Sequence, residues 1–400
     1  MRYRPIVFAS LLLAASSALL AQHEKEPKRP KMPAQADTND AHQYYNFALE
    51  LLGHDDDKAA DALYWATRLE PTWADAFYAR RVALLLADPH RLTQYWAGDR
   101  RTIQSDEIRR IDSLFYHALT LNPFVSQRLD RRLFETVIDE ITKKYERAGA
   151  GNSGEIRYYI DREMNNWPAA DRAWLAYGDG RYPDALRLYA EAIKADKRNG
   201  PLRLDRARIF ANMNEPDSAL AELTAAIEDL RKRDKKDLIF VYQSKALTEH
   251  SIGVVQSRLG HDDAAKEAYG RALQEDLSYY PAHVQLAMLA IAAKDTTNAL
   301  TEMDLAVQLR PDDAAARYLY GFTLAGAGKL ADAETHLRKA GELNSVYAAP
   351  HFVLAQVLEA QSKKADAVTE YRTFLARAAR VDPRRAEAET RLAALSGSGL

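Results

Sequence analysis

The sequence contains no cysteine among its 400 residues. This absence excludes a disulfide framework, thiolate zinc sites, iron–sulfur clusters and a cysteine nucleophile. Neither sign of charge is in excess, because 55 Lys and Arg residues nearly balance 57 Asp and Glu residues and leave a formal charge of −2. Nucleic-acid-binding proteins normally carry a strongly basic balance, so the composition argues against that class of partner. The 47% of hydrophobic residues is still sufficient for a large packed core.

Long apolar runs are missing after residue 21. The run over 6–21 (IVFASLLLAASSALLA) follows Arg2 and Arg4, a pattern typical of an export signal. Its 16 residues fall short of the roughly 20 that a membrane-spanning helix needs. We therefore predict a signal peptide over 1–21, cleaved after Ala18 or Ala21, and a periplasmic or extracellular protein. An uncleaved N-terminal membrane anchor is the alternative.

Residues 22–40 contain three prolines, many charges and almost no large apolar side chain. Such a segment cannot bury enough surface to offset the loss of chain entropy on ordering. We predict a disordered linker between the signal and the folded body.

An internal repeat occupies most of the chain from residue 41 onward. Its marker is an alanine, a bulky residue four positions later and a second alanine three positions after that. From Ala185 onward the marker recurs every 34 residues, except that Ala219 and Ala265 are 46 residues apart and so enclose a 12-residue insertion. The six instances are Ala59/Leu63/Ala66, Ala185/Tyr189/Ala192, Ala219/Leu223/Ala226, Ala265/Tyr269/Ala272, Ala299/Met303/Ala306 and Ala333/Leu337/Ala340.

This spacing is helical, because offsets of three, four and seven residues share one helix face. Small residues such as Gly253 and Gly321 lie upstream, where a second helix would cross. The 34-residue period resembles the tetratricopeptide repeat family. The resemblance implies an all-α protein, a right-handed α-solenoid of stacked helix–turn–helix repeats. The family's early tryptophan is mostly replaced here, by Phe77, His283, Arg317 and His351.

The repeat pattern also predicts the domain bounds. Repeats over 41–123 would carry an inserted loop at about 88–105, and a degenerate helical pair would follow over 124–166. Regular repeats would occupy 167–382, before a capping helix and tail over 383–400.

Signals for chemistry are weak throughout the chain. Residues 149–154 match the spacing G-x-G-x-x-G, but the preceding segment is helical rather than a strand, so we predict an inter-helix loop. His54-Asp55-Asp56-Asp57 and His261-Asp262-Asp263 are the best metal candidates by residue type. Both lie where the second helix of a pair begins, so helix capping explains them better. We predict that the basic run 231–237 is a solvated loop, with contact to an anionic surface as the alternative. We predict no catalytic residue, metal or cofactor.

The resemblance implies that the first helices of successive repeats line a concave groove. The groove positions on which we place partner contacts are Trp174, Tyr177, Arg208, His250, Met288, Tyr318, Phe322, Phe352 and Gln356. Tyr318, Phe322 and Phe352 are expected to form an aromatic strip, although packing against the next repeat is an alternative role for any of these positions.

We therefore expect an exported scaffold or adaptor, not an enzyme, that binds peptide or helical segments of other proteins. A membrane-anchored envelope-assembly factor is one alternative. An enzyme with a site within 88–166 is the other.

Overall fold

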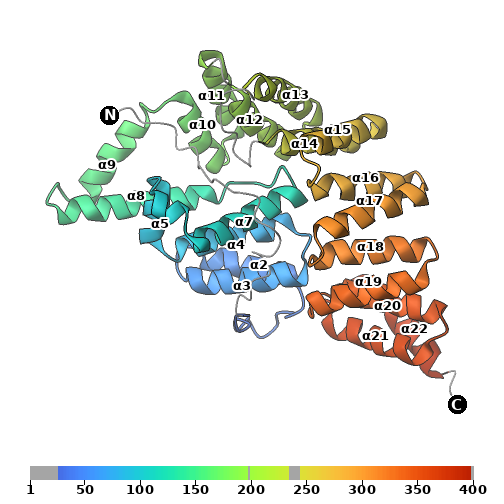
Figure 1. Cartoon of the computed structure of the whole chain (residues 1–400). Coiled ribbons are helices and arrows are strands. Elements are labelled where there is room, and N and C mark those ends of the chain that lie inside the picture. The colour runs from blue at the N-terminus through green and yellow to red at the C-terminus, as the bar shows by residue number, and fades with distance from the viewer. Residues whose placement is uncertain (1–25, 197–198, 234–243, 398–400) are drawn as a thin grey trace. The chain divides into compact units, whose positions relative to one another are not determined.

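The computed structural model describes residues 26–196, 199–233 and 244–397 (Figure 1). Every regular element within these ranges is a helix, which confirms the predicted all-α class. The predicted signal peptide and most of the basic run at 231–237 lie outside the described residues. In the described part of the chain, no helix is both long and apolar enough to cross a membrane.

The chain divides into two compact units, each assembled from separate stretches of sequence. The described part of the first unit comprises residues 52–60 and 77–275, and that of the second comprises 26–51, 61–76 and 276–397. The first unit contains most of α4 (Ala74–Leu86). It also contains α5 (Pro89–Trp96), α6 (Arg100–Ile103), α7 (Asp106–Leu121), α8 (Asp130–Arg147), α9 (Ser153–Met164), α10 (Ala169–Gly178), α11 (Tyr182–Ala195), α12 (Gly200–Asn212), α13 (Pro216–Arg233), α14 (Lys245–Arg258) and α15 (Asp262–Glu275). The second unit holds α2 (Ala41–Leu51), most of α3 (Asp56–Leu69), α16 (Tyr280–Ala292), α17 (Thr296–Leu309), α18 (Ala314–Gly326), α19 (Leu330–Leu343), α20 (Ala349–Ala360), α21 (Lys364–Arg377) and α22 (Arg385–Gly397).

Helix pairs stack in chain order within each unit. In the first unit the pairs α10–α11, α12–α13 and α14–α15 each pack against the next. In the second unit, α16 to α21 form three further pairs, and α22 packs on α21 at the end of the stack (Figure 1). This arrangement confirms the predicted solenoid of helix–turn–helix repeats.

The alanine-containing triplets form the seams between helices. All six are buried, and their central residues Leu63, Leu337 and Met303 have no exposed surface. At the crossing points, a Cβ atom on Gly253 would lie 2.4 Å from the ring of Tyr269, and one on Gly321 would lie 2.7 Å from Leu337. The predicted small residues are therefore required by the close approach of the two helices in each pair.

In the six helix pairs from α10 to α21, the turn inside each pair contains one residue with a left-handed backbone, at the same place in each repeat. Gly180, Gly260 and Gly328 fill this place with φ of 75–76°. Asn214, Lys294 and Ser362 fill it in the intervening repeats with φ of 59–64°. Glycine adopts this conformation without steric cost, which explains why it marks half of the turns in the sequence.

The stretch 88–105, expected to be a loop, instead forms α5 and α6, so that prediction is wrong. Asp88 caps α5 by accepting a hydrogen bond from the backbone N–H of Arg91 at 2.9 Å, and Pro89 occupies the first helical position. Aspartate followed by proline is a strong helix-start signal. Leu92 and Tyr95 are then buried, so α5 belongs to the core of its unit.

The contribution of an N-terminal helix cap to stability can be tested at α18. The carboxylate of Asp313 accepts hydrogen bonds from the backbone N–H groups of Ala315 and Ala316 at 2.9 and 3.0 Å. Asp313→Ala is therefore expected to lower the free energy of unfolding by about 1 kcal/mol. Asp312→Ala, at the exposed neighbouring position, is the matched control. Equal losses for the two variants in urea titrations would contradict the capping role.

Candidate functional site

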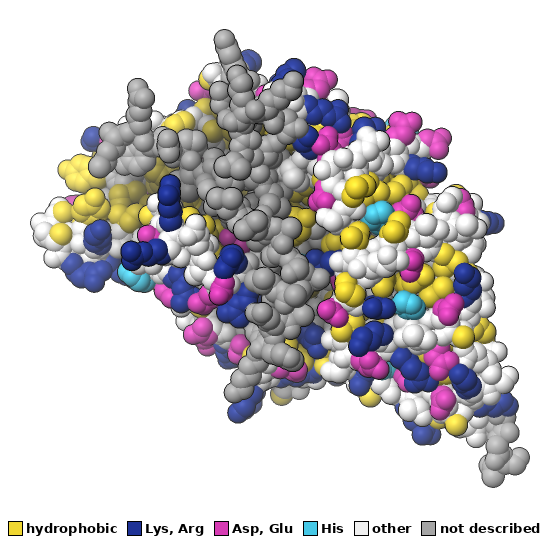
Figure 2. Space-filling model, in the orientation of Figure 1, with side chains coloured by type: hydrophobic (Ala, Val, Ile, Leu, Met, Phe, Trp, Pro, Cys, Tyr) yellow, Lys and Arg dark blue, Asp and Glu magenta, His cyan; other side chains and the backbone are white. Residues whose placement is uncertain are grey.

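Two of the predicted groove residues are large apolar side chains that remain exposed. Met288 on α16 is 45% exposed and Phe322 on α18 is 50% exposed. They occupy equivalent positions 34 residues apart on the first helices of successive repeats. Figure 2 shows hydrophobic side chains at the surface over the C-terminal helices of the second unit. We call Met288 and Phe322, together with the half-buried Tyr318, the apolar strip.

Tyr318 extends the apolar strip toward the interior. Its ring centroid lies 6.4 Å from that of Phe322 and 5.5 Å from that of the buried Tyr347. Burial raises the pKa of the Tyr318 hydroxyl above its ordinary value, with smaller influences from Arg384 and Asp382. Tyr318 therefore both packs against the core and borders the exposed ring of Phe322.

Phe352, expected in the same aromatic strip, is only 6% exposed and lies in the core. Its ring centroid is 5.1 Å from that of Phe374 and 6.2 Å from that of Tyr371. The guanidinium of Arg384 lies 5.9 Å from the same ring. The expectation that Phe352 is free for a ligand is therefore wrong, because α21 and the segment before α22 cover it.

Two other predicted groove residues are also interior. His250 on α14 has no exposed surface, and burial lowers its pKa to about 3. Tyr177 on α10 is 4% exposed, and its hydroxyl accepts a hydrogen bond from the backbone N–H of Gln127 at 3.0 Å. These positions hold the first unit together, and neither presents a surface to a partner.

The remaining predicted positions are engaged within the chain. Trp174 belongs to an aromatic cluster, with its ring centroid 6.0 Å from that of Trp96 on α5 and 5.7 Å from that of Phe134 on α8. Arg208 forms an ion pair with Asp205 at 2.8 Å. Gln356 donates a hydrogen bond to Glu387 on α22 at 3.0 Å. Of the nine predicted positions, Met288 and Phe322 carry the large exposed apolar surface.

Sequence reasoning missed a buried polar network in the first unit. The guanidinium of Arg81 on α4 is 3% exposed and lies 3.5 Å from the Asp112 carboxylate and 3.4 Å from that of Asp130. The hydroxyls of Tyr95 and Tyr78 donate to these same carboxylates at 3.0 and 2.9 Å. Burial raises the pKa of Asp130, while the charge of Arg81 opposes the shift. The network joins α4, α5, α7 and α8, and its burial marks it as structural.

A second feature concerns three of the four positions at which the repeat lacks its tryptophan, those of His283, Arg317 and His351. At that position the first helix instead carries a side chain that bonds to the second helix 19 residues later. His283 lies 2.7 Å from Glu302, and His351 lies 2.6 Å from Glu370. Arg317 lies 3.3 Å from His336 at the corresponding place between them. A polar contact thus replaces the bulky ring as the link between paired helices.

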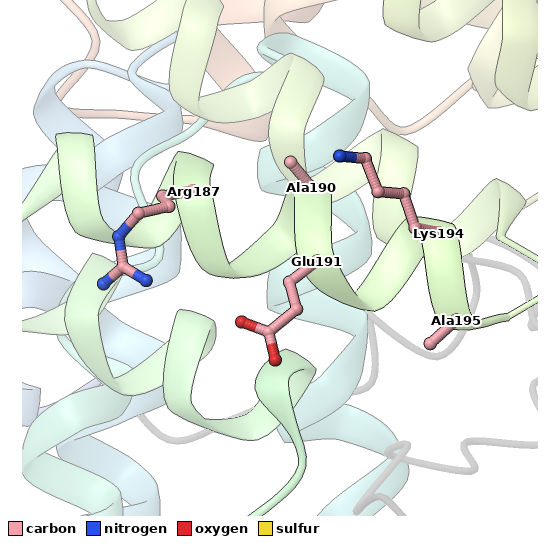
Figure 3. Close-up of a pocket in the computed structure, with 5 residues that line it drawn as sticks. All are labelled: Arg187, Ala190, Glu191, Lys194 and Ala195. Atoms are coloured by element: carbon pink, nitrogen blue, oxygen red, sulfur yellow. The ribbon is translucent and has the colours of Figure 1, made fainter.

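Two surface hollows among the described residues do not bring reactive groups together. One is a shallow depression along α11, lined by Arg187, Ala190, Glu191, Lys194 and Ala195 (Figure 3). All five residues come from this single helix, and their charged side chains spread along it. Another hollow lies among α13, α14 and α15. Its buried Glu249 is bound by Arg231 at 2.6 Å and by Arg271 at 3.0 Å, so the charge of this carboxylate is compensated.

The aspartates of the two histidine and aspartate clusters lie at helix starts. Asp55 accepts a hydrogen bond from the backbone N–H of Lys58 at 3.3 Å, and Asp56 accepts one from Gly53 at 2.7 Å. Asp262 and Asp263 lie in the first turn of α15. Among the described residues, no group of three or more potential ligands is arranged to hold a metal ion.

The family comparison agrees with the period and the fold. Residues 176–235, from the end of α10 through α13, match the model of the tetratricopeptide repeat. This match identifies a tetratricopeptide repeat in that part of the first unit. No curated protein matches the sequence.

Three solved structures are similar to this chain in fold. YrrB, described as a TPR protein with an unusual peptide-binding site, has 20% identity over 51% of this chain and 98% of its own, with a TM-score of 0.41. The C-terminal part of a TPR repeat-containing protein from Cytophaga hutchinsonii has 16% identity over 57% of this chain and 84% of its own, with a TM-score of 0.45. The APC/C hetero-tetramer Cut9-Hcn1 has 14% identity over 89% of this chain and 76% of its own, with a TM-score of 0.41.

Proposed function

We propose that this protein is a scaffold that binds segments of other proteins at the apolar strip of its second unit. The proposal rests on the exposure of Met288 and Phe322 at equivalent positions of successive repeats. Methionine and aromatic side chains are enriched at protein interfaces, where they supply large contact area. A partner segment that lies across two repeats would meet the same kind of contact at each one.

The chemistry of the strip favours an apolar partner face. An amphipathic helix or an extended peptide with spaced apolar residues would bury Met288 and Phe322 and leave its own polar face in water. The half-buried Tyr318 would support the contact, because its ring already borders that of Phe322. Binding would then depend on buried area more than on charge.

We further propose that the protein is exported, with an adaptor role outside the cytoplasm. This part rests on the apolar run at 6–21 and the arginines before it. The mass of the mature chain distinguishes cleavage after Ala18 or Ala21 from retention of an N-terminal anchor, the alternative in which the protein assembles envelope components at a membrane.

The apolar strip can be tested by truncating its most exposed ring. Phe322→Ala is expected to weaken partner binding by about 1–3 kcal/mol, because an exposed ring that becomes buried in a complex contributes at this scale. The melting temperature should change little, since the ring is half exposed in the free protein. The partner would first be identified by pull-down from the native envelope with the full chain. Its affinity would then be measured for each variant by calorimetry.

Leu305→Ala is the matched control for this experiment. Leu305 is 37% exposed but lies on α17, the second helix of its pair. The control should bind the partner with wild-type affinity. If Phe322→Ala and Met288→Ala also bind normally, or if Leu305→Ala weakens binding equally, the apolar strip is not the binding surface.

A further inference from the structure

The segment before α2 is attached to the end of the last repeat, although its composition predicts a disordered linker. The Asp37 side chain accepts a hydrogen bond from the backbone N–H of Arg380 at 2.5 Å, across 343 residues of sequence. The amide of Asn39 donates to the carbonyl of Ala376 at 2.9 Å. The guanidinium of Arg380 in turn donates to the carbonyl of Gln35 at 2.8 Å. All of these residues belong to the second unit.

These contacts provide hydrogen-bond partners for the C-terminal end of α21. The last carbonyl groups of a helix have no partner within the helix and must be satisfied by other groups. Ala376 lies in the last turn of α21, and its carbonyl is satisfied by Asn39. Asp37 then binds the chain just beyond the helix end. The segment thus completes the C-terminal end of α21 with side chains from the opposite end of the protein.

Further hydrogen bonds and a ring contact hold the segment itself in place. One oxygen of Asp37 accepts from the backbone N–H of Asn39 at 3.0 Å while its other oxygen faces Arg380. The backbone N–H of Asp37 donates to the side chain of Gln43 on α2 at 2.7 Å. Upstream, the guanidinium of Arg29 lies 4.4 Å from the centroid of the Trp65 ring and donates to the carbonyl of Thr38 at 2.8 Å. Asp37 itself is only 8% exposed.

A second contact of the same type lies one repeat earlier. The amide of Asn344, directly after α19, donates to the carbonyl of Arg68 in the last turn of α3 at 2.6 Å. The guanidinium of Arg68 reaches the carbonyl of Leu343 at 3.4 Å. The first repeat and the segment before it therefore contact the ends of two successive second helices, α19 and α21.

We propose that residues 35–39 form an intramolecular clasp that binds the C-terminal end of α21 and joins the first and last repeats into one cooperative unit. In an open solenoid each repeat contacts only its neighbours, so a change near residue 37 would not reach residue 380. With the clasp, the order of the last repeat depends on a segment more than 300 residues away in sequence. The occupant of this surface is the protein's own N-terminal segment, recognised by a carboxylate and an amide that bind backbone groups.

Hydrogen exchange of the full chain tests the clasp directly. Asp37→Ala and Asn39→Ala should each speed exchange of the Arg380 amide and of the amides at the end of α21 by about tenfold or more. In the wild type this end of the helix can open only when the clasp contacts break, whereas in each variant one of these contacts is already missing. Exchange in α12 and α13 of the first unit should not change. Glu26→Ala, at an exposed position of the same segment, is the control and should match the wild type. Wild-type exchange at residues 376–382 in both clasp variants would overturn the proposal.

Cross-linking provides a second measurement that leaves the side chains of Asp37 and Asn39 and the backbone carbonyl of residue 35 in place. Because the sequence lacks cysteine, Gln35→Cys combined with Val381→Cys introduces the only two thiols, both at exposed positions. A bismaleimide reagent should give an intramolecularly cross-linked monomer, identified by peptide mass mapping. Cross-linked dimers alone would show that the segment binds a second copy, and no cross-link would show that it is detached. Either of these results would refute an intramolecular clasp.

Discussion

Replacement of Arg81 by methionine is expected to lower the free energy of unfolding by about 3–5 kcal/mol. The guanidinium lies between the carboxylates of Asp112 and Asp130, and all three side chains are nearly inaccessible to water. Methionine preserves most of the volume but leaves two negative charges in the interior without this cation. The tyrosine hydroxyls that bind the carboxylates cannot supply the missing charge. The loss should therefore reach the range measured when one partner of a buried ion pair is removed.

Urea denaturation of the full chain at neutral pH, followed by circular dichroism, measures this loss. Arg110→Met, at an exposed position of α7, is the control and should stay within about 0.5 kcal/mol of the wild type. Adding Asp112→Asn and Asp130→Asn to Arg81→Met removes both charges and should restore part of the stability. A loss below 1 kcal/mol for Arg81→Met would show that the network is hydrated or dispensable.

The repeat fold was predictable because its signal is local and periodic. Ala265, Tyr269 and Ala272 share one helix face by spacing alone, and the structure buries all three. The small residue at Gly253 was expected at the helix crossing, and the ring of Tyr269 does occupy the space that a side chain there would need. Such features depend on residues within one helix pair, so a single sequence is enough to find them.

The buried network and the clasp were not predictable, because they join residues that no periodicity connects. Asp130 and Asp37 look like ordinary polar residues at a helix start and in a charged linker. Only the tertiary fold brings them to Arg81 and to the backbone of Arg380. The polar contacts between paired helices were detectable in principle, since His283 and Glu302 share their 19-residue spacing with His351 and Glu370.

The expectation of an exposed groove was wrong for several positions, because the position in the repeat does not determine exposure. Phe322 and Gln356 occupy equivalent places, yet Gln356 is bound to α22. Phe352 is equivalent to Tyr318, but the end of the stack buries it more deeply. The terminal repeat has a different neighbour from the internal ones, and the sequence alone does not say which surfaces that neighbour covers.

A buried histidine should make the first unit sensitive to mild acid. His250 has no exposed surface, and burial lowers its pKa from 6.5 to about 3. Below pH 6.5 the unfolded chain binds a proton at this site while the folded chain does not. Stability is therefore present above pH 6.5 and is lost as the pH falls. Each pH unit corresponds to about 1.4 kcal/mol, so this histidine alone should lower the free energy of unfolding by about 2 kcal/mol between pH 6.5 and pH 5.

The contribution of His250 to this pH dependence is found by comparing how steeply the free energy of unfolding changes with pH in the wild type and in a variant. His250→Gln removes the titrating group, so its free energy of unfolding should fall by about 2 kcal/mol less than that of the wild type over the same pH interval. This difference remains measurable even if the substitution lowers stability at every pH. His54→Gln, at an exposed turn position, should keep the wild-type slope. Parallel pH profiles for wild type and His250→Gln would show that His250 accepts a proton in the folded state and would contradict this prediction.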